Sequence, residues 1–270
     1  MNNAIPVRTQ AERADQTRAR ILDAAVRQFS ENGLAGARTE QIAEAAGVNK
    51  ALLYYYFTSK EDLYAAAIEA VIGSVRADSV SVLEAEISAG ERIVHIVLRN
   101  FDRSYSYPAM RSLMQQEMVR LHRGEENSLA PMVEKFFRPL WLMMDKVIAE
   151  GIASGELVSA DPAQMRHAAL GANILYFLTA PLSQLVYGTD PMERGALAFR
   201  RQAAIEFLGQ AIFVDREHGA RVAAKVLAAT PMPDLVEMSG ASCKDGLAGE
   251  DSVLSEAKAH AIQNEVIQSH

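Results

Sequence analysis

Residues 17–64 read TRARILDAAVRQFSENGLAGARTEQIAEAAGVNKALLYYYFTSKEDLY, and this stretch decides the fold. Ile21, Ala25 and Phe29 recur at four-residue spacing, which places them on one face of a helix predicted over 16–32. Gly33 follows at a position where a left-handed residue can end a helix. The pattern therefore predicts an amphipathic helix that stops at a glycine.

Two short helices are predicted next. Thr39 is expected to cap a helix over 39–46. Gly47 then allows a sharp turn before Asn49, which can cap a helix over 50–57. Two short helices joined by a glycine turn and braced by a longer helix form the helix-turn-helix plan.

The helix over 50–57 is expected to be the element that reads DNA. Leu53 and Phe57 share one face and belong to the core, so the other side chains point outward. Lys50 can reach guanine acceptors or a phosphate, and the tyrosines at 54–56 can offer rings to sugars and hydroxyls to phosphates. The alternative is a tyrosine-rich helix that is simply half buried.

The composition is that of a soluble protein with enough chain to close a core. The 270 residues are 49% hydrophobic and 23% charged, which excludes collagen-like and wholly disordered chains. A single cysteine, Cys243, excludes an intramolecular disulfide, and the polar start of the chain lacks a signal-peptide core, so a cytoplasmic protein is expected. The net charge of −7 argues against binding nucleic acid by bulk positive charge, but it allows a local contact surface.

Charge and helix breakers divide the chain into four expected segments. Residues 1–15 are a flexible arm, 16–76 the helix-turn-helix domain, and 77–229 a larger helical domain. The last segment, 230–270, is an acidic tail that is expected to be disordered, because residues 231–270 hold seven acidic and two basic side chains among Pro, Gly and Ser.

Apolar residues beyond residue 57 continue at spacings of three and four, without the alternation of strands. The predicted fold class is therefore all-α, with an N-terminal three-helix domain and a larger helical domain after it. The further helices are expected over 60–86, 90–106, 109–122, 129–153, 162–187, 191–217 and 219–228.

The order of short motifs between Thr17 and Tyr64 is specific. LDAA, Phe29, Gly33, QIAEAAGV, LLYYYF and SKEDL follow one another without interruption, and together they resemble the DNA-binding domain of TetR-family transcriptional regulators. The resemblance implies a helical homodimer whose larger C-terminal domain binds a small molecule and dimerises. The expected function is a ligand-responsive repressor of a near-palindromic operator in double-stranded DNA, without a cofactor, and an activator is the alternative within this class.

The resemblance carries candidate DNA contacts over by position. Lys50 and Ala51 would contact bases, while the tyrosines and Lys60 would contact phosphates. Two departures matter: Arg38 stands where a small hydroxyl residue is common, with Thr39 one position later, and Tyr56 stands where histidine is frequent. The candidate DNA-binding residues are Arg38, Thr39, Lys50, Ala51, Tyr54, Tyr55, Tyr56 and Lys60.

An uncharged stretch lies over residues 168–189, so a membrane span has to be weighed against a buried helix. Asn173, Thr179 and Pro181 make a poor lipid-facing segment, and no membrane contact is expected. A homodimer through 162–217 is predicted instead. The predicted helix over 191–217 would contribute one face to the dimer interface, formed by Gly195, Phe199, Ala203, Phe207 and Gln210.

A pocket for a small, mostly apolar effector is favoured by seven of the eleven methionines, which lie between residues 108 and 165. Polar groups in the same helices could orient the ligand, although each has an alternative role in the core or on the surface. The candidate ligand-binding residues are His95, Arg99, Met114, Glu117, Met118, Trp141, Asn173 and Tyr176.

Enzymatic chemistry has little support in the sequence. It contains no phosphate-binding loop, dinucleotide fingerprint or nucleophile elbow, and its six histidines show no metal-ligand spacing. The expected function is therefore a DNA-binding regulator without catalytic activity or a metal. The alternatives are a helical scaffold or binding protein, and a helical enzyme that uses the C-terminal cavity.

Overall fold

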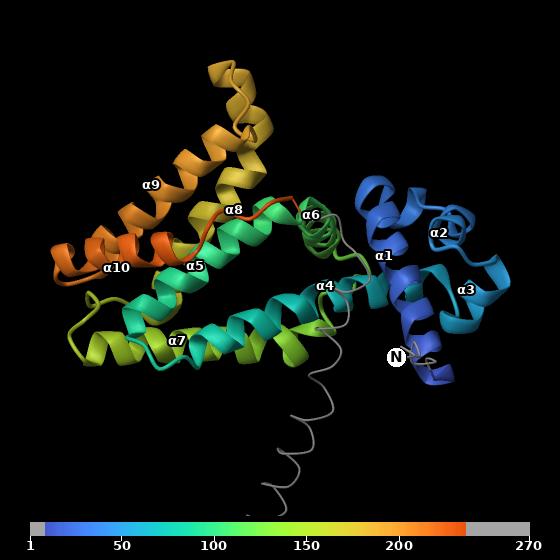
Figure 1. The fold of residues 1–270 in the computed structure, drawn as a ribbon, viewed down its shortest axis with the longest axis horizontal. Helices are drawn as coiled ribbons and strands as arrows, with labels where there is room; N and C mark the ends of the chain where they lie inside the picture. Colours follow the sequence, from blue (N-terminus) through green and yellow to red (C-terminus); the bar gives the residue numbers. More distant parts are fainter. Residues whose placement is uncertain (1–8, 236–270) are drawn as a thin grey trace, which may run out of the picture. The chain divides into compact units, whose positions relative to one another are not determined.

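The computed structural model describes residues 9–235, which are almost entirely helical (Figure 1). The predicted all-α fold class is confirmed, with one isolated antiparallel bridge between Leu157 and Phe213 as the β pairing within these residues. The helices are α1 (Gln10–Gly36), α2 (Thr39–Ala45), α3 (Lys50–Tyr56), α4 (Lys60–Leu83), α5 (Ala89–Ser106), α6 (Pro108–His122), the π-helix η1 (Val133–Phe137), α7 (Arg138–Ala153), α8 (Pro162–Tyr187), α9 (Arg194–Ile212) and α10 (Arg216–Ala229).

Helix α1 begins earlier than predicted. The Glu12 amide donates to the Thr9 hydroxyl at 3.2 Å and the Thr9 amide donates to the Glu12 carboxylate at 2.8 Å, which is a complete capping box. The expectation of a flexible arm over 1–15 is therefore wrong for residues 10–15. Gly33 has a φ of 68° and interrupts the helix where the sequence predicted a stop.

The chain packs as two units. Within the described residues, the first holds 9–77 and 112–130, and the second holds 78–111 and 131–235. The first division between the two units falls between residues 77 and 78. Residues 112–130, which the sequence assigned to the larger domain, instead pack with the helix-turn-helix.

The core of the first unit contains the apolar faces predicted for α1 and α3. Ile21 and Phe29 of α1, Ile42 of α2 and Leu53 of α3 are fully buried. Phe29 also meets the ring of Tyr64 edge-on, with 4.9 Å between ring centres. Burial of these side chains packs α2 against α1 and α3 against α2.

Helix α5 is the centre of the second unit and contacts α7, α8, α9 and α10. A buried ion pair joins α5 to α9, because Arg201 donates to both oxygens of Asp102 at 2.6 and 2.8 Å. Arg201 also donates to the Thr230 carbonyl at 2.8 Å, just after α10. The opposite charges and hydrogen bonds of the two partners compensate for the cost of burying them, whereas a single buried charge would remain uncompensated.

Two predicted helices end differently in the structure. Helix α9 stops at Ile212 rather than 217, because Phe213 turns extended and bridges to Leu157. The predicted helix over 129–153 begins only at Val133, as one π-helical turn that leads into α7.

Helices α9 and α10 approach closely at two glycines. A Cβ on Gly209 would lie 2.5 Å from the Gly219 carbonyl oxygen, and a Cβ on Gly219 would collide with the Gly209 backbone. Only residues without a side chain allow this backbone contact.

Candidate nucleic-acid interface

Helix α3 is held at both ends and exposes one face. Asn49 caps its start by accepting from the Leu52 amide at 2.7 Å, after Gly47 turns the chain with a φ of 64°. Leu53 anchors the buried face, and Phe57 ends the helix in the core. On the outward side Tyr55 is 81% exposed, the most exposed large side chain of the helix.

Lys50 lies on this surface and is paired with a carboxylate. Its ammonium is 2.5 Å from Glu40 Oε1 on α2 and 5.8 Å from the centre of the Tyr54 ring. The hydrogen bond to Glu40 raises the pKa of Lys50, and the same bond lowers the pKa of Glu40. Both groups are therefore charged at neutral pH. Sequence reasoning did not name Glu40, although a carboxylate directly after Thr39 was the available signal.

The start of α2 differs from the prediction. Arg38 is the N-cap residue and makes no side-chain cap, whereas Thr39 is the first helical residue. The Thr39 hydroxyl lies 3.3 Å from the Tyr54 hydroxyl, so it is turned toward α3 rather than back to its own helix. The expectation that Thr39 caps this helix is therefore wrong, and the Arg38 side chain is exposed.

The start of α4 carries part of a capping box. The Asp62 amide donates to the Ser59 hydroxyl at 3.0 Å, while the Asp62 carboxylate accepts from the Thr58 amide at 2.8 Å rather than from Ser59. Lys60, in the first turn, donates to the Ala35 carbonyl at 3.2 Å. Lys60 therefore belongs to the junction of α1 and α4, beside the helix-turn-helix.

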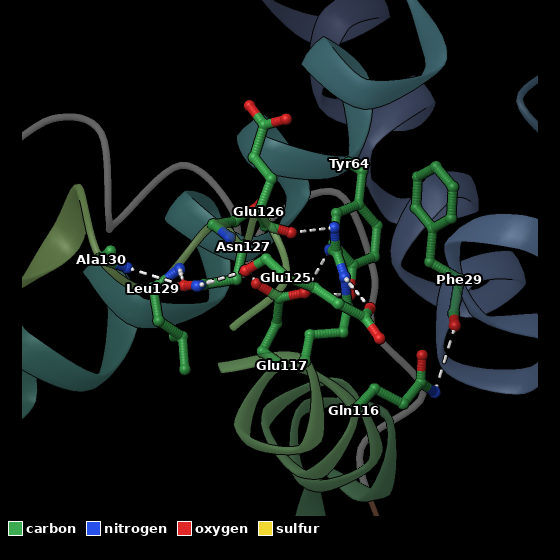
Figure 2. Close-up of polar contacts among 11 residues, drawn as sticks. Phe29, Tyr64, Gln116, Glu117, Glu125, Glu126, Asn127, Leu129 and Ala130 are labelled. Atoms are coloured by element: carbon green, nitrogen blue, oxygen red, sulfur yellow. Dashed lines mark hydrogen bonds and ion pairs between the residues drawn. The ribbon is translucent and has the colours of Figure 1, made fainter. Parts of the chain in front are cut away.

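A buried carboxylate joins α6 to α4 within the first unit, and Figure 2 shows its contacts. Glu117 is fully buried and accepts from the Tyr64 hydroxyl at 3.0 Å, from Arg120 at 2.7 Å and from the Ser128 amide at 2.5 Å. Burial, together with the Glu117 charge, raises the pKa of Tyr64, so the phenol stays a donor. Gln116 donates to the Ser30 carbonyl at 3.1 Å and fastens α6 to α1.

An open groove of about 720 Å³ lies beside this contact, between the end of α1, the start of α4 and α6. Lys60 and Arg120 line it together with Glu61 and Glu125. Because the groove has two positive and two negative side chains, it favours neither an anionic nor a cationic ligand.

The candidate ligand residues fall in both units. Glu117 in the first unit is fully engaged, and Met118 is 44% exposed beside the half-buried Met114. In the second unit, His95 lies 3.9 Å from Glu91, and Arg99 pairs with Asp78.

The remaining three candidates lie on α7 and α8. Trp141 is 44% exposed and stacks under the Arg166 guanidinium, which is 4.4 Å from the centre of the ring. Tyr176 donates to the Pro191 carbonyl at 2.6 Å. Asn173 is buried and donates to the Val97 carbonyl at 2.9 Å and to Asn100 Oδ1 at 3.2 Å. Its own Oδ1 is buried and accepts from no group in residues 9–235.

Helices α8 and α9 expose much apolar surface. The window of α8 with a mean hydropathy of 1.3 is only 22% buried, so by length and composition this helix could cross a membrane. Phe199 and Phe207 of α9 are 75% and 74% exposed. The exposed apolar face defined by these two helices comprises Ile174, Leu175, Leu178, Leu182, Leu185, Val186, Tyr187, Phe199 and Phe207.

Metal-binding geometry is not found where the chain is described. Between residues 9 and 235, no three His, Cys, Asp or Glu side chains group closely enough to hold an ion.

Comparison with known proteins agrees with the geometry of the first unit. Residues 21–67 match the family described as bacterial regulatory proteins, tetR family. The chain is 47% identical over 64 residues to the HTH-type transcriptional repressor NicS of Pseudomonas putida, covering 24% of this chain and 30% of NicS. It is 34% identical over 148 residues to the HTH-type transcriptional regulator RutR of Escherichia coli, covering 53% and 65%. Each match thus spans less than two thirds of the relative's own length.

Solved structures share the fold over most of their length. FadR of Bacillus subtilis, solved with stearoyl-CoA, has a TM-score of 0.55 at 23% identity and covers 70% of this chain and 96% of its own. A regulator of Saccharomonospora viridis, solved with choline, has a TM-score of 0.59 at 19% identity and covers 73% and 97%. Residues 21–67 therefore carry the helix-turn-helix domain described for bacterial regulatory proteins of the tetR family, and the chain is similar to transcriptional regulators that match it over this region.

Proposed function

We propose that this protein is a transcriptional repressor that binds a near-palindromic operator as a homodimer and is released by a small molecule. The observation that carries the proposal is the capped, exposed face of α3, with Lys50 and Tyr55 presented outward and Leu53 locked in the core. A helix fixed in this way can enter a major groove without losing its shape. Repression rather than activation is supported by the repressor named above, whose match covers the DNA-binding region.

The proposed DNA contacts follow from exposure and neighbours. Lys50 and Ala51 would contact base edges, and Tyr54, Tyr55 and Tyr56 would contact the sugar-phosphate backbone. Lys60 would add a phosphate contact, and Arg38 is exposed for another, beside Thr39.

Dimerisation is supported by the exposed apolar face of α8 and α9. A monomer would leave Leu182, Leu185 and Phe207 in water, each at least 60% exposed. A second copy packed on this face would bury them in a four-helix arrangement. Two recognition helices could then meet successive major grooves about 34 Å apart.

The proposed effector site lies in the second unit. Asn173 is the candidate with unmet hydrogen-bonding capacity, since its buried Oδ1 still lacks a donor within residues 9–235. A ligand that brings an N–H or O–H group would satisfy it. The two solved structures named above hold stearoyl-CoA and choline, which differ in charge and size and therefore do not indicate one ligand class. The proposal of a ligand with an N–H or O–H donor rests on Asn173 of this chain.

Selection of bound DNA from a random pool tests the central proposal. We expect enrichment of an inverted repeat whose half-sites lie about one helical turn apart. Enrichment of no sequence, or of a single half-site bound by one protomer, would contradict it. A screen of compounds by thermal shift, followed by Asn173→Ala, then tests the effector site: the variant should lose the response while it keeps operator binding.

A further inference from the structure

A carboxylate on the DNA-reading surface is unexpected, because DNA presents phosphates there. Glu40 and Lys50 come from the two helices of the helix-turn-helix, and their side chains are 62% and 52% exposed. Their 2.5 Å contact sets a donor and an acceptor side by side on this surface.

The pair belongs to a connected set of side chains. Lys50 lies over the ring of Tyr54 at 5.8 Å, and the Tyr54 hydroxyl meets the Thr39 hydroxyl at 3.3 Å. Glu40 directly follows Thr39 in the chain. The Lys50 ammonium therefore lies beside the Glu40 carboxylate and over the Tyr54 ring before any DNA is bound.

Pairing changes how Lys50 responds to arbitrary DNA. Non-specific affinity arises from free cations that meet phosphates, and a lysine that is already paired contributes little to it. The Glu40 carboxylate is itself repelled by the phosphate backbone. A G·C base pair, in contrast, presents guanine acceptors beside the cytosine N4 donor in the major groove. Such a pair can take the Lys50 ammonium and the Glu40 carboxylate together.

We propose that Glu40 is a specificity-determining residue, which masks Lys50 on arbitrary DNA and reads a G·C base pair with it on the operator. The inference rests on the proposed function, since it concerns how the same surface selects its DNA.

The test compares Glu40→Gln with Glu44→Gln, which removes an equal charge from an exposed position one turn further along α2. Dissociation constants are measured for the selected operator and for a random duplex of equal length, at several salt concentrations. One regained phosphate contact changes the salt slope by about 0.9, which corresponds to about an eightfold gain at 0.1 M relative to 1 M salt. We expect Glu40→Gln to bind random DNA about five- to tenfold more tightly at 0.1 M salt, and Glu44→Gln to change little.

Two further arms locate the effect. In a Lys50→Ala background, Glu40→Gln should tighten random DNA no more than Glu44→Gln does, because no lysine is released. Replacing the contacted G·C pair by A·T should weaken operator binding by the wild-type protein more than it weakens operator binding by Glu40→Gln. Circular-dichroism melts show whether each variant is folded.

The outcomes separate the two levels of the argument. A wild-type protein that enriches no DNA sequence contradicts the proposed function itself. A wild-type protein with a selected operator, but with equal behaviour of Glu40→Gln and Glu44→Gln on random DNA, overturns the role of Glu40 alone. The role of Glu40 is also overturned if Glu40→Gln has the same ratio of operator affinity to random-DNA affinity as the wild type.

Discussion

Lys50 and Lys60 are two lysines of one domain with different neighbours. Lys50 is placed by Glu40 on the outward face of α3, whereas Lys60 is hydrogen-bonded to the Ala35 carbonyl at the base of α4. The first position suits base edges and the second suits the DNA backbone.

Replacing each lysine should therefore have a distinct effect. Lys50→Ala should weaken operator binding about 10–100-fold and relax base preference at one position. Lys60→Ala should weaken all sequences alike and reduce the salt slope by about 1. Fluorescence anisotropy with operator and random duplexes measures both. Equal losses of operator and random binding for Lys50→Ala would remove it as a base-reading residue.

His95 predicts a pH dependence of stability. Burial, reinforced by Arg99 and Lys225 and opposed by Glu91, holds the pKa of His95 below its ordinary value of 6.5. The folded state therefore binds fewer protons than the unfolded state near this pKa. The stability that comes from keeping His95 neutral is fully present above pH 6.5, and it is lost as the pH falls toward the lower pKa of the folded state.

The expected result is a fall in thermal midpoint as the pH drops below 6.5, and this fall should be smaller in His95→Gln. His122→Gln serves as the control, because His122 is exposed on α6. A wild-type midpoint that falls no more steeply than that of His95→Gln would show that His95 does not contribute.

At the scale of elements, what the sequence could predict was local. The Asn49 cap, the Gly47 turn and the Leu53 face all depend on residues within a few positions of each other, and the structure confirms them. The Thr9 capping box was equally local and readable from Thr9 and Glu12, but no apolar stripe pointed to it.

Pairs distant in sequence could not be found in this way. Glu117 contacts Tyr64 across 53 positions, and Arg201 contacts Asp102 across 99. Periodicity shows which face of a helix is apolar, but not which other helix meets it. For the same reason the sequence suggested Glu117 as a ligand contact, whereas its oxygens are occupied by protein donors.

The close contact of α9 and α10 gives a prediction about packing. Gly219→Ala should destabilise the protein by about 1–3 kcal/mol, because the new methyl group meets the Gly209 backbone, which cannot move aside cheaply. Urea unfolding measures the loss. Gly195→Ala is the matched control: its Cβ meets nothing nearer than 4.0 Å, so stability should hold or rise by up to about 1 kcal/mol. Equal stability of the two variants would show that the helices separate without cost.

For the whole molecule, the exposed apolar face of α8 and α9 predicts the assembly. Phe207→Arg should give a monomer and reduce operator binding to the level of random DNA, since two half-sites no longer act together. Leu142→Arg changes a side chain that is 60% exposed on α7, and it should leave the dimer intact. Analytical ultracentrifugation reports both. A wild-type protein that sediments as a monomer at micromolar concentration, yet binds its operator tightly, would refute the dimer.

The same apolar face has a consequence for protein synthesis. In the proposed dimer this face is covered only by a second copy, so a newly made chain would expose Leu185, Tyr187 and Phe199 until it binds one. Such surfaces attract chaperones and other unfinished chains, most of all when copies are scarce. A gene that is translated many times from one messenger would supply neighbouring copies at the ribosome, so the yield of active regulator should rise more steeply than the amount of chain produced.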